Sequence, residues 1–314
     1  MAGGWRWPGT TCGSSCGASC AAWRANGLRV LSKDGDFRLE RPQVYADPRE
    51  IGPVEWVICA LKATAIGEAA ELIAPCVGRE TRIVALMNGL GNEQRLAERF
   101  EGWRIFGGMA FVCINRGEPG VIHHLDYGRV SVGHFEDDAG MCEELAALLQ
   151  SGGIETVVAP NLRFARWEKL CWNVPFNGLS VAGGGIGTRT VLEDPELRRM
   201  AEGAMREVVR AGNADLAAAG SAARLDGGEL VARMFAQTEA MGDYRTSMVI
   251  DYVLGRPLEV EAILGNPVRR ARELGVEVPR MEALYALVRH ADLARRGERR
   301  LLGAGSAEMP GAVV

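Results

Sequence analysis

The chain has 314 residues, of which 47% are hydrophobic and 24% charged, and its formal net charge is −4. This length allows two domains with separate hydrophobic cores, and the composition excludes a disordered or fibrous protein. Charges of both signs are intermixed, no apolar run approaches the roughly 20 residues that span a bilayer, and no signal peptide is evident. We therefore expect a cytoplasmic protein that binds neither nucleic acid nor membranes.

The first 27 residues contain no Leu, Ile or Val, so we expect no buried strand there. We interpret residues 1 to about 22 as a misassigned or frame-shifted start, because their excess of Gly, Cys, Ser and Trp suits an out-of-frame reading of GC-rich DNA. From Leu28 the stretch LRVLSKDGDFRL alternates apolar and polar residues around an Asp-Gly pair, which predicts two short strands joined by a turn.

Two apolar runs, VEWVICAL at 54–61 and RIVALM at 82–87, are each followed by a helical pattern, from Ile66 to Leu72 and from Glu93 onward. Strands that alternate with helices at this spacing predict a parallel sheet with crossover helices.

Segments 103–114 and 129–135 are predicted to be extended, with turn signals around Glu118-Pro119-Gly120, and 140–151 is predicted to be helical. The first domain, residues 28–158, is therefore expected to be an α/β domain built on a parallel sheet.

After Pro160 the pattern becomes almost wholly helical, and we expect a helical second domain over 159–296 followed by a tail over 297–314. Asp194 followed by Pro195 is a helix-start signal, with Asp as the N-cap. Gly255 and Gly275 lie where helices are expected to stop.

The eight cysteines form two groups. Five are scattered through apolar stretches and are expected to be reduced core residues: Cys59, Cys76, Cys113, Cys142 and Cys171. Cys12, Cys16 and Cys20 could hold a metal, but zinc and iron–sulfur sites use tighter pairs, and no His or fourth Cys completes the set. The four histidines show no metal spacing, so we predict no metal site.

Lys169, Asn173 and Asn177 lie at i, i+4 and i+8 and would form one polar stripe on a helix with apolar surroundings. An ammonium and two amides in such a place need partners, which a polar ligand would supply. A lysine drawn partly out of water has a lowered pKa, which suits proton transfer. The alternative is a surface lysine with two capping or solvated asparagines.

Other candidates are weaker when taken singly. Asn88 and Lys62 each follow an apolar strand at the edge where open α/β sheets bind ligands, although a plain turn and a solvated lysine explain them equally well. Glu259 and Glu261 could simply complement a helix dipole, and Ser247 could be a helix cap.

From about Arg24 to about Arg295 the chain resembles ketopantoate reductase (2-dehydropantoate 2-reductase). The resemblance is carried by the pieces that occur in this order: ANGLRV with its Asp-Gly-Asp-Phe turn, Leu61-Lys62-Ala63, Met87-Asn88-Gly89-Leu90-Gly91-Asn92-Glu93, Trp167-Glu168-Lys169-Leu170 with Asn173 and Asn177, and Ser247-Met248 through Gly255-Arg256-Pro257-Leu258-Glu259-Val260-Glu261. Together they are specific, whereas no single piece is.

The resemblance implies a Rossmann-type domain followed by a helical substrate domain, with NADPH and ketopantoate in the cleft between them. It implies that Lys169 protonates the substrate carbonyl oxygen and that Glu259 hydrogen-bonds the hydroxyl formed and positions the lysine. The remaining implied roles are substrate binding by Asn173, Asn177 and Ser247, and cofactor binding by Asn88 and Lys62.

The start of the chain departs from the family. The family opens with an apolar strand that runs into G-x-G-x-x-G, whose glycines admit the cofactor pyrophosphate at a helix N-terminus. Here that strand is missing and Gly13-x-x-x-Gly17 is a poor substitute. The preference for NADP therefore rests on the resemblance alone.

Three alternatives stay open beside an NADPH-dependent ketopantoate reductase of pantothenate and coenzyme A biosynthesis. They are a reductase of another small 2-oxo acid, a non-catalytic relic that has lost cofactor binding, and a metal protein that uses the first three cysteines. The expected partner is a small 2-oxo acid, and a homodimer is an expected assembly because helical substrate domains often pair.

Overall fold

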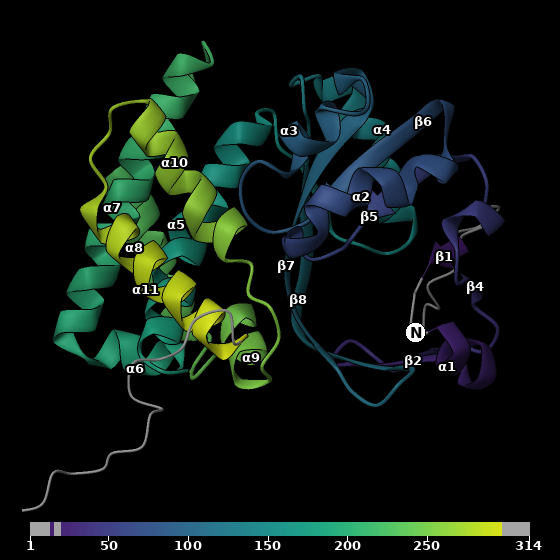
Figure 1. Ribbon diagram of the computed structural model, residues 1–314, viewed down its shortest axis with the longest axis horizontal. Helices are drawn as coiled ribbons and strands as arrows, with labels where there is room; N and C mark the ends of the chain where they lie inside the picture. Colours follow the sequence, from purple (N-terminus) through teal and green to yellow (C-terminus); the bar gives the residue numbers. More distant parts are fainter. Residues whose placement is uncertain (1–12, 16–19, 297–314) are drawn as a thin grey trace, which may run out of the picture. The chain divides into compact units, whose positions relative to one another are not determined.

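The computed structural model describes residues 13–15 and 20–296 and divides the chain into two units, Met1–Arg166 and Trp167–Val314. The first is built around a sheet and the second consists of helices (Figure 1). The predicted tail over 297–314, together with Cys12 and Cys16, lies outside the described residues. No described helix combines the length and apolar character needed to cross a bilayer.

The first unit contains a seven-stranded sheet with the order β3-β2-β8-β7-β6-β5, and β9 pairs with β8. Its strands are β2 (Leu28–Ser32), β3 (Phe37–Leu39), β5 (Val54–Cys59), β6 (Val77–Leu86), β7 (Ile105–Arg116), β8 (Val121–His134) and β9 (Thr156–Val158). Strands β5, β6 and β7 are parallel, whereas β7 and β8 form a long antiparallel hairpin. The predicted parallel α/β core is therefore confirmed.

The hairpin is longer than the sequence predicted. Strand β8 begins at Val121, eight residues before the expected start, and its first residues pair with β2. Two irregularities in the β7–β8 pairing and the positive φ of Tyr127 and Gly128 interrupt the apolar alternation by which a strand is recognised. The turn expected around Glu118-Pro119-Gly120 is present.

The segment before Leu28 contains two elements that the sequence did not predict. Strand β1 (Gly13–Ser15) pairs in parallel with β4 (Gln43–Tyr45) in a separate two-stranded sheet, and helix α1 spans Cys20–Asn26. A strand of Gly and Ser can pair through its backbone without apolar side chains to bury. The seven-stranded sheet takes none of its strands from the described residues before Leu28, in agreement with the sequence.

Helices cover both faces of the seven-stranded sheet because successive strand residues point to opposite sides. Ile83 and Ala85 of β6 pack in one core with residues of α2 (Ile66–Ile73) and α3 (Asn92–Ala97). Val84, which lies between them, packs in a second core with residues of α4 (Ala139–Ser151). Short 3₁₀ turns complete this unit: Pro48–Glu50, Ala63–Ala65, Ala74–Cys76 and Gly102–Arg104.

The second unit is helical, as expected. Helix α5 (Leu162–Ala182) contains the boundary between the units, and the helices after it are α6 (Thr188–Glu193), α7 (Pro195–Ala218), α8 (Gly227–Ala240), α9 (Ser247–Val253), the π-helical turn Glu261–Gly265, α10 (Asn266–Glu273) and α11 (Pro279–Arg295).

The caps agree with the sequence. Asp194 accepts hydrogen bonds from the backbone of Glu196 and Leu197, and Gly255 and Gly275 have φ of 66° and 67° just after α9 and α10.

A buried ion pair fixes the first turn of α5 within the first unit. Arg166 and Glu93 are 3% and 2% exposed, and the Arg166 guanidinium donates to the Glu93 carboxylate. It also donates to the backbone oxygens of Met87 at 2.5 Å and Ala85 at 3.1 Å. The pair therefore ties α5 to the end of β6 and to the start of α3.

Two glycines make room for the same helix. Gly107 of β7 and Gly133 of β8 face each other across the hairpin. A Cβ atom on Gly107 would lie 2.5 Å from Leu162 Cδ1 and would also clash with Glu93, and one on Gly133 would lie 3.0 Å from Leu162 Cβ. Side chains at these positions would push Leu162 away from the sheet.

Replacing Arg166 should destabilise the first unit. Arg166→Met leaves the Glu93 carboxylate buried without its charge partner, and we expect unfolding free energy to fall by about 3–5 kcal/mol. Urea unfolding measures this loss. Arg199→Met is the matched control, because the Arg199–Glu196 pair has side chains 67% and 78% exposed. Equal urea midpoints for the two variants would contradict the anchoring role of Arg166.

Adding a methyl group at Gly107 should also be costly. We expect Gly107→Ala to lower the free energy of unfolding by about 1–3 kcal/mol, because Leu162 and Glu93 must move. Gly67→Ala in α2 is the control, since its Cβ would meet nothing within 4 Å and alanine favours a helix. A Gly107→Ala protein as stable as Gly67→Ala would rule out the proposed seat for α5.

Candidate functional site

Helix α5 carries the predicted stripe, and its two asparagines are buried. Asn173 is 6% exposed and Asn177 is 1% exposed, whereas Lys169 is partly buried one turn before them. All three lie inside the helix, so neither asparagine is a cap or a solvated surface residue. Burial of two amides on the face that carries a lysine is costly unless each amide is hydrogen-bonded.

Asn177 satisfies much of its amide within the second unit. Its Nδ2 donates to the backbone oxygen of Asn173 at 3.0 Å, and its Oδ1 accepts from the backbone nitrogen of Met248 at 3.3 Å. This second bond joins the stripe to the start of α9, beside Ser247. The structure thus brings together three of the predicted residues, Asn173, Asn177 and Ser247.

Ser247 does not cap α9. The cap is Thr246, whose buried side chain accepts from the backbone nitrogen of Val249 at 3.4 Å. Ser247 is the first residue of the helix and is exposed. Its hydroxyl is therefore not used for capping, which was the alternative explanation of this residue.

The two acidic residues have different surroundings. Glu259 is 5% exposed and directly precedes the helical turn, whereas the Glu261 carboxylate is 55% exposed and bound by neighbouring side chains. One of these is Arg269. Burial lowers the pKa of the Arg269 guanidinium, but its hydrogen bonds and its proximity to Glu261 outweigh burial and raise it.

Lys62 and Asn88 lie at one edge of the sheet in the first unit. They follow the parallel strands β5 and β6, whose carboxyl ends are paired at Cys59 and Ala85. Lys62 is exposed, and Asn88 is partly buried in a turn whose Gly89 and Gly91 have φ near 92° and 93°. The Asn88 carbonyl oxygen accepts a hydrogen bond from Asn92 at 2.9 Å.

The Arg166–Glu93 pair was not predicted from the sequence. In the sequence, Glu93 stands out only as the last residue of the motif that begins at Met87. The sequence signal for a buried Arg166 is its position directly before Trp167 in a largely apolar stretch. The neighbouring residues do not identify its partner, which lies 73 positions away.

Cysteines and histidines offer no second site among the described residues. Burial raises the pKa of the Cys171 thiol in α5 to about 12, so this group stays protonated and is a poor nucleophile. His134 is buried, with hydrogen bonds to Trp103 and to backbone nitrogens of the following turn. Within residues 13–15 and 20–296 no three His, Cys, Asp or Glu side chains are grouped to hold a metal.

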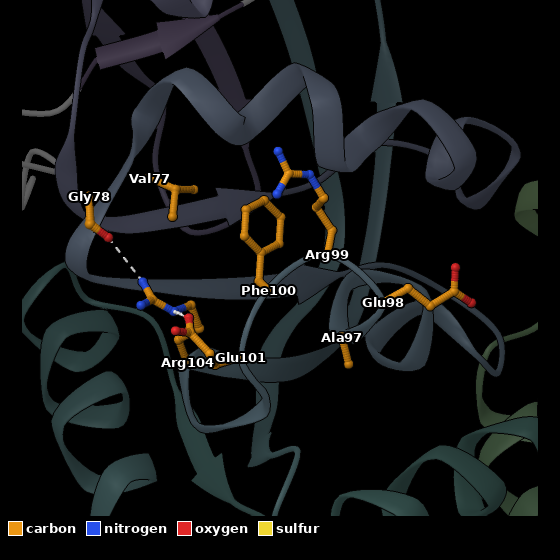
Figure 2. A pocket seen from close by; sticks show the side chains of 8 residues that line it. All are labelled: Val77, Gly78, Ala97, Glu98, Arg99, Phe100, Glu101 and Arg104. Carbon is orange, nitrogen blue, oxygen red and sulfur yellow. Dashed lines mark hydrogen bonds and ion pairs between the residues drawn. The ribbon is translucent and has the colours of Figure 1, made fainter.

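A surface cavity of about 520 Å³ in the first unit contains none of the predicted site residues. Its lining is Val77, Gly78, Ala97, Glu98, Arg99, Phe100, Glu101 and Arg104 (Figure 2). The buried Arg104 guanidinium donates to the carbonyl oxygens of Gly78, Arg79 and Thr81 and is paired with Glu101. The guanidinium therefore ties the first half of β6 to the turn Gly102–Arg104, and we assign the cavity no ligand.

Two family models together match most of the chain. Residues 16–137 match the model described as ketopantoate reductase PanE/ApbA, and residues 161–292 match the model of the ketopantoate reductase PanE/ApbA C terminal.

Similar proteins point the same way. A 2-dehydropantoate 2-reductase from Nostoc sp. is 38% identical over 275 residues, which cover 85% of this chain and 83% of that protein. The crystal structure of 2-dehydropantoate 2-reductase from Geobacter metallireducens is 41% identical, with a TM-score of 0.86 and coverage of 90% and 92%. The ternary structure of D-mandelate dehydrogenase with NADH and anilino(oxo)acetate, 20% identical with a TM-score of 0.82 over 92% of this chain and 93% of that chain, shares the fold. This chain belongs to the ketopantoate reductase (PanE/ApbA) family.

Proposed function

We propose that this chain is an oxidoreductase that reduces 2-dehydropantoate (ketopantoate) to pantoate with NADPH, in the cytoplasmic synthesis of pantothenate and coenzyme A. The observation that carries the proposal is the polar stripe on α5, in which Asn173 and Asn177 are buried and Lys169 is partly buried. Asn177 accepts a hydrogen bond from the backbone nitrogen of Met248, next to Ser247. Family membership supplies the reaction class.

The stripe suits a small 2-oxo acid. Such a substrate carries a carboxylate and a neighbouring ketone, and both accept hydrogen bonds. Amide and hydroxyl groups can bind the carboxylate as neutral donors, and an ammonium group can give its proton to the ketone oxygen as negative charge develops there. Asn173 and Ser247 are proposed as these donors, while the bond of Asn177 to the backbone nitrogen of Met248 suits it to holding the Ser247–Met248 peptide in place.

The choice of lysine at position 169 supports proton transfer. Of the 36 Lys and Arg residues only three are lysines, namely Lys33, Lys62 and Lys169. This chain therefore uses arginine for nearly every task that needs a positive charge. Arginine does not give up its proton near neutral pH, whereas lysine can when its surroundings favour the neutral form. A lysine at 169 is explained by a task that arginine cannot perform.

Glu259 is proposed to accept a hydrogen bond from the hydroxyl group of the product and to orient Lys169. A carboxylate that is 5% exposed and lies just before a helical turn can hold a fixed direction. This assignment follows the family pattern of residues 255–261.

The described residues fit the cofactor only in part. Lys62 supplies a cation and Asn88 a turn at the carboxyl edge of the parallel strands, where α/β proteins bind nucleotides. The pyrophosphate cradle is not provided by the described residues, because Gly13 belongs to the small β1–β4 sheet. When bound, NADPH supplies hydride to the substrate carbonyl carbon, and the other roles proposed here belong to side chains of this chain.

The first test replaces Lys169. We expect Lys169→Ala and Lys169→Arg both to lower kcat for ketopantoate reduction by about 100- to 10,000-fold, because neither side chain can deliver the proton. Oxidation of NADPH, followed by its absorbance with ketopantoate and with a set of other 2-oxo acids, measures this loss and identifies the preferred substrate.

Lys33→Arg is the matched control for Lys169→Arg. Lys33 lies in the first unit and pairs with Asp126 at 3.0 Å, and we expect unchanged kcat. Full turnover by a folded Lys169→Arg protein would overturn the role of Lys169 as proton donor, since charge alone would then suffice.

The second test measures cofactor binding directly. We expect the chain to quench or shift NADPH fluorescence on binding, and Lys62→Ala to raise the Kd about tenfold at low salt, with most of the loss recovered in Lys62→Arg. A folded chain that binds no NADPH would favour the alternative of a non-catalytic relic.

A further inference from the structure

The backbone on both sides of Glu259 is held by helix α11. Glu259 lies between buried Leu258 and Val260, which are 4% and 3% exposed, and the π-helical turn Glu261–Gly265 follows at once. This short segment therefore has one attachment before Glu259 and another after it. Helix α11 contributes to both attachments.

The attachment before Glu259 is made by Asp292. Its Oδ1 accepts a hydrogen bond from the backbone nitrogen of Leu258 at 3.1 Å, and its Oδ2 lies 3.5 Å from the Arg296 guanidinium. Asp292 is only 7% exposed, although aspartate residues are seldom buried to this extent unless they are paired. The bond fixes the peptide that leads directly into Glu259.

The attachment after Glu259 is made through Glu261. The Tyr285 hydroxyl donates to both oxygens of the Glu261 carboxylate, at 3.0 and 3.1 Å. Arg269 donates to the same carboxylate at 2.7 Å, and Arg289 lies 3.7 Å from it. A Cβ on Gly265 would lie 2.6 Å from the Glu261 carboxylate, so only glycine leaves room for this cluster.

The residues of α11 that make these contacts share one face. Tyr285, Arg289 and Asp292 lie at i, i+4 and i+7, so they follow one side of the helix. We propose that Tyr285 and Asp292 are positioning residues that hold Glu259 in its working orientation. Asp292 fixes the chain before Glu259 at the Leu258 backbone, and Tyr285 fixes it after Glu259 at the Glu261 side chain. This inference rests on the role of Glu259 in the proposed function.

The π-helical turn after Glu259 explains why the segment needs these contacts. Its hydrogen bonds run from residue i to residue i+5, and such turns are rare and occur frequently at functional sites. Without the contacts of α11, residues 261–265 would be free to relax into a regular α-helical turn. That change would rotate Glu259 relative to the rest of the second unit.

The test compares Asp292→Ala, Asp292→Asn and Tyr285→Phe, each alone and combined with Glu259→Ala. We expect Asp292→Ala to lower kcat about 10- to 100-fold with little change in KM for NADPH, because a misplacement near 1 Å has effects of this size. Asparagine keeps an oxygen acceptor for Leu258, so Asp292→Asn should stay within about threefold. Tyr285→Phe should lower kcat about two- to fivefold.

The double variants separate positioning from a general loss of structure. In the Glu259→Ala background, Asp292→Ala should add less than about a twofold loss, because the residue that it positions is gone. Glu282→Ala is the matched control on α11. It removes the 2.7 Å pair with Arg272, which links α10 to α11 without contacting residues 258–261, and should leave kcat unchanged.

Hydrogen exchange gives a readout that needs no substrate or cofactor. The Leu258 amide should be protected in the unchanged chain and in Asp292→Asn, and should exchange at least about tenfold faster in Asp292→Ala. Equal exchange in all three proteins would overturn the attachment whether or not the chain turns over.

The outcomes also separate this inference from the proposed function. Unchanged kcat in a folded Asp292→Ala protein, together with a loss in Glu259→Ala, would overturn the positioning role alone. Equal losses from Asp292→Ala with and without Glu259 would do the same. Full turnover by Glu259→Ala would overturn the role of Glu259 and this inference with it.

Discussion

The ion pair between Arg166 and Glu93 is the contact on which the arrangement of the first unit depends. A buried charge pair is expensive to desolvate, and it persists here because the guanidinium also donates to two backbone oxygens at the end of β6. One side chain thus fixes the turn that bears Asn88, the start of α3 and the first turn of α5. Gly107 and Gly133 provide the space that this close approach requires. Helix α5, which carries the candidate site, therefore begins where these two glycines of the sheet leave space for Leu162.

The same helix changes its role along its length. Its first turn belongs to the first unit, and its later turns are the centre of the second. There Trp167 donates to Asp215 at 2.8 Å and Trp172 donates to Thr238 at 2.9 Å, so two bulky side chains are fixed in direction by hydrogen bonds. Arg270 in turn pairs with Asp215. A helix held at so many points can present Lys169 and Asn173 with little freedom, and proton transfer requires such fixed geometry.

Much of this was predictable from sequence, for physical reasons that also mark the limit. β5 and β6 were found because each contains a continuous apolar run, although β5 ends the strand order and only its Cys59 is buried. The start of α7 was found because Asp194 and Pro195 act locally. The stripe on α5 was found because helical periodicity places its members on one face. Partners that are distant in sequence left no such signal: Arg166 with Glu93, Asp292 with Leu258, and Tyr285 with Glu261. The strand β1 was missed because its residues, one Gly and two Ser, are not apolar, and the early part of β8 was missed because bulges break its alternation.

Arginine and lysine have different tasks in this chain. Arginine, with its fixed fork of donors, ties elements of this chain together at three buried or partly buried places: Arg166 at the end of β6, Arg104 on three carbonyl oxygens, and Arg270 on Asp215. Each of these contacts needs a side chain that stays charged and whose donors have fixed directions. Lysine offers less direction, but it can exchange a proton. The proposed role of Lys169 follows this division, because Lys169 lies on the helix that carries the two buried amides, and its replacement by arginine therefore tests the chemistry of the side chain rather than its charge.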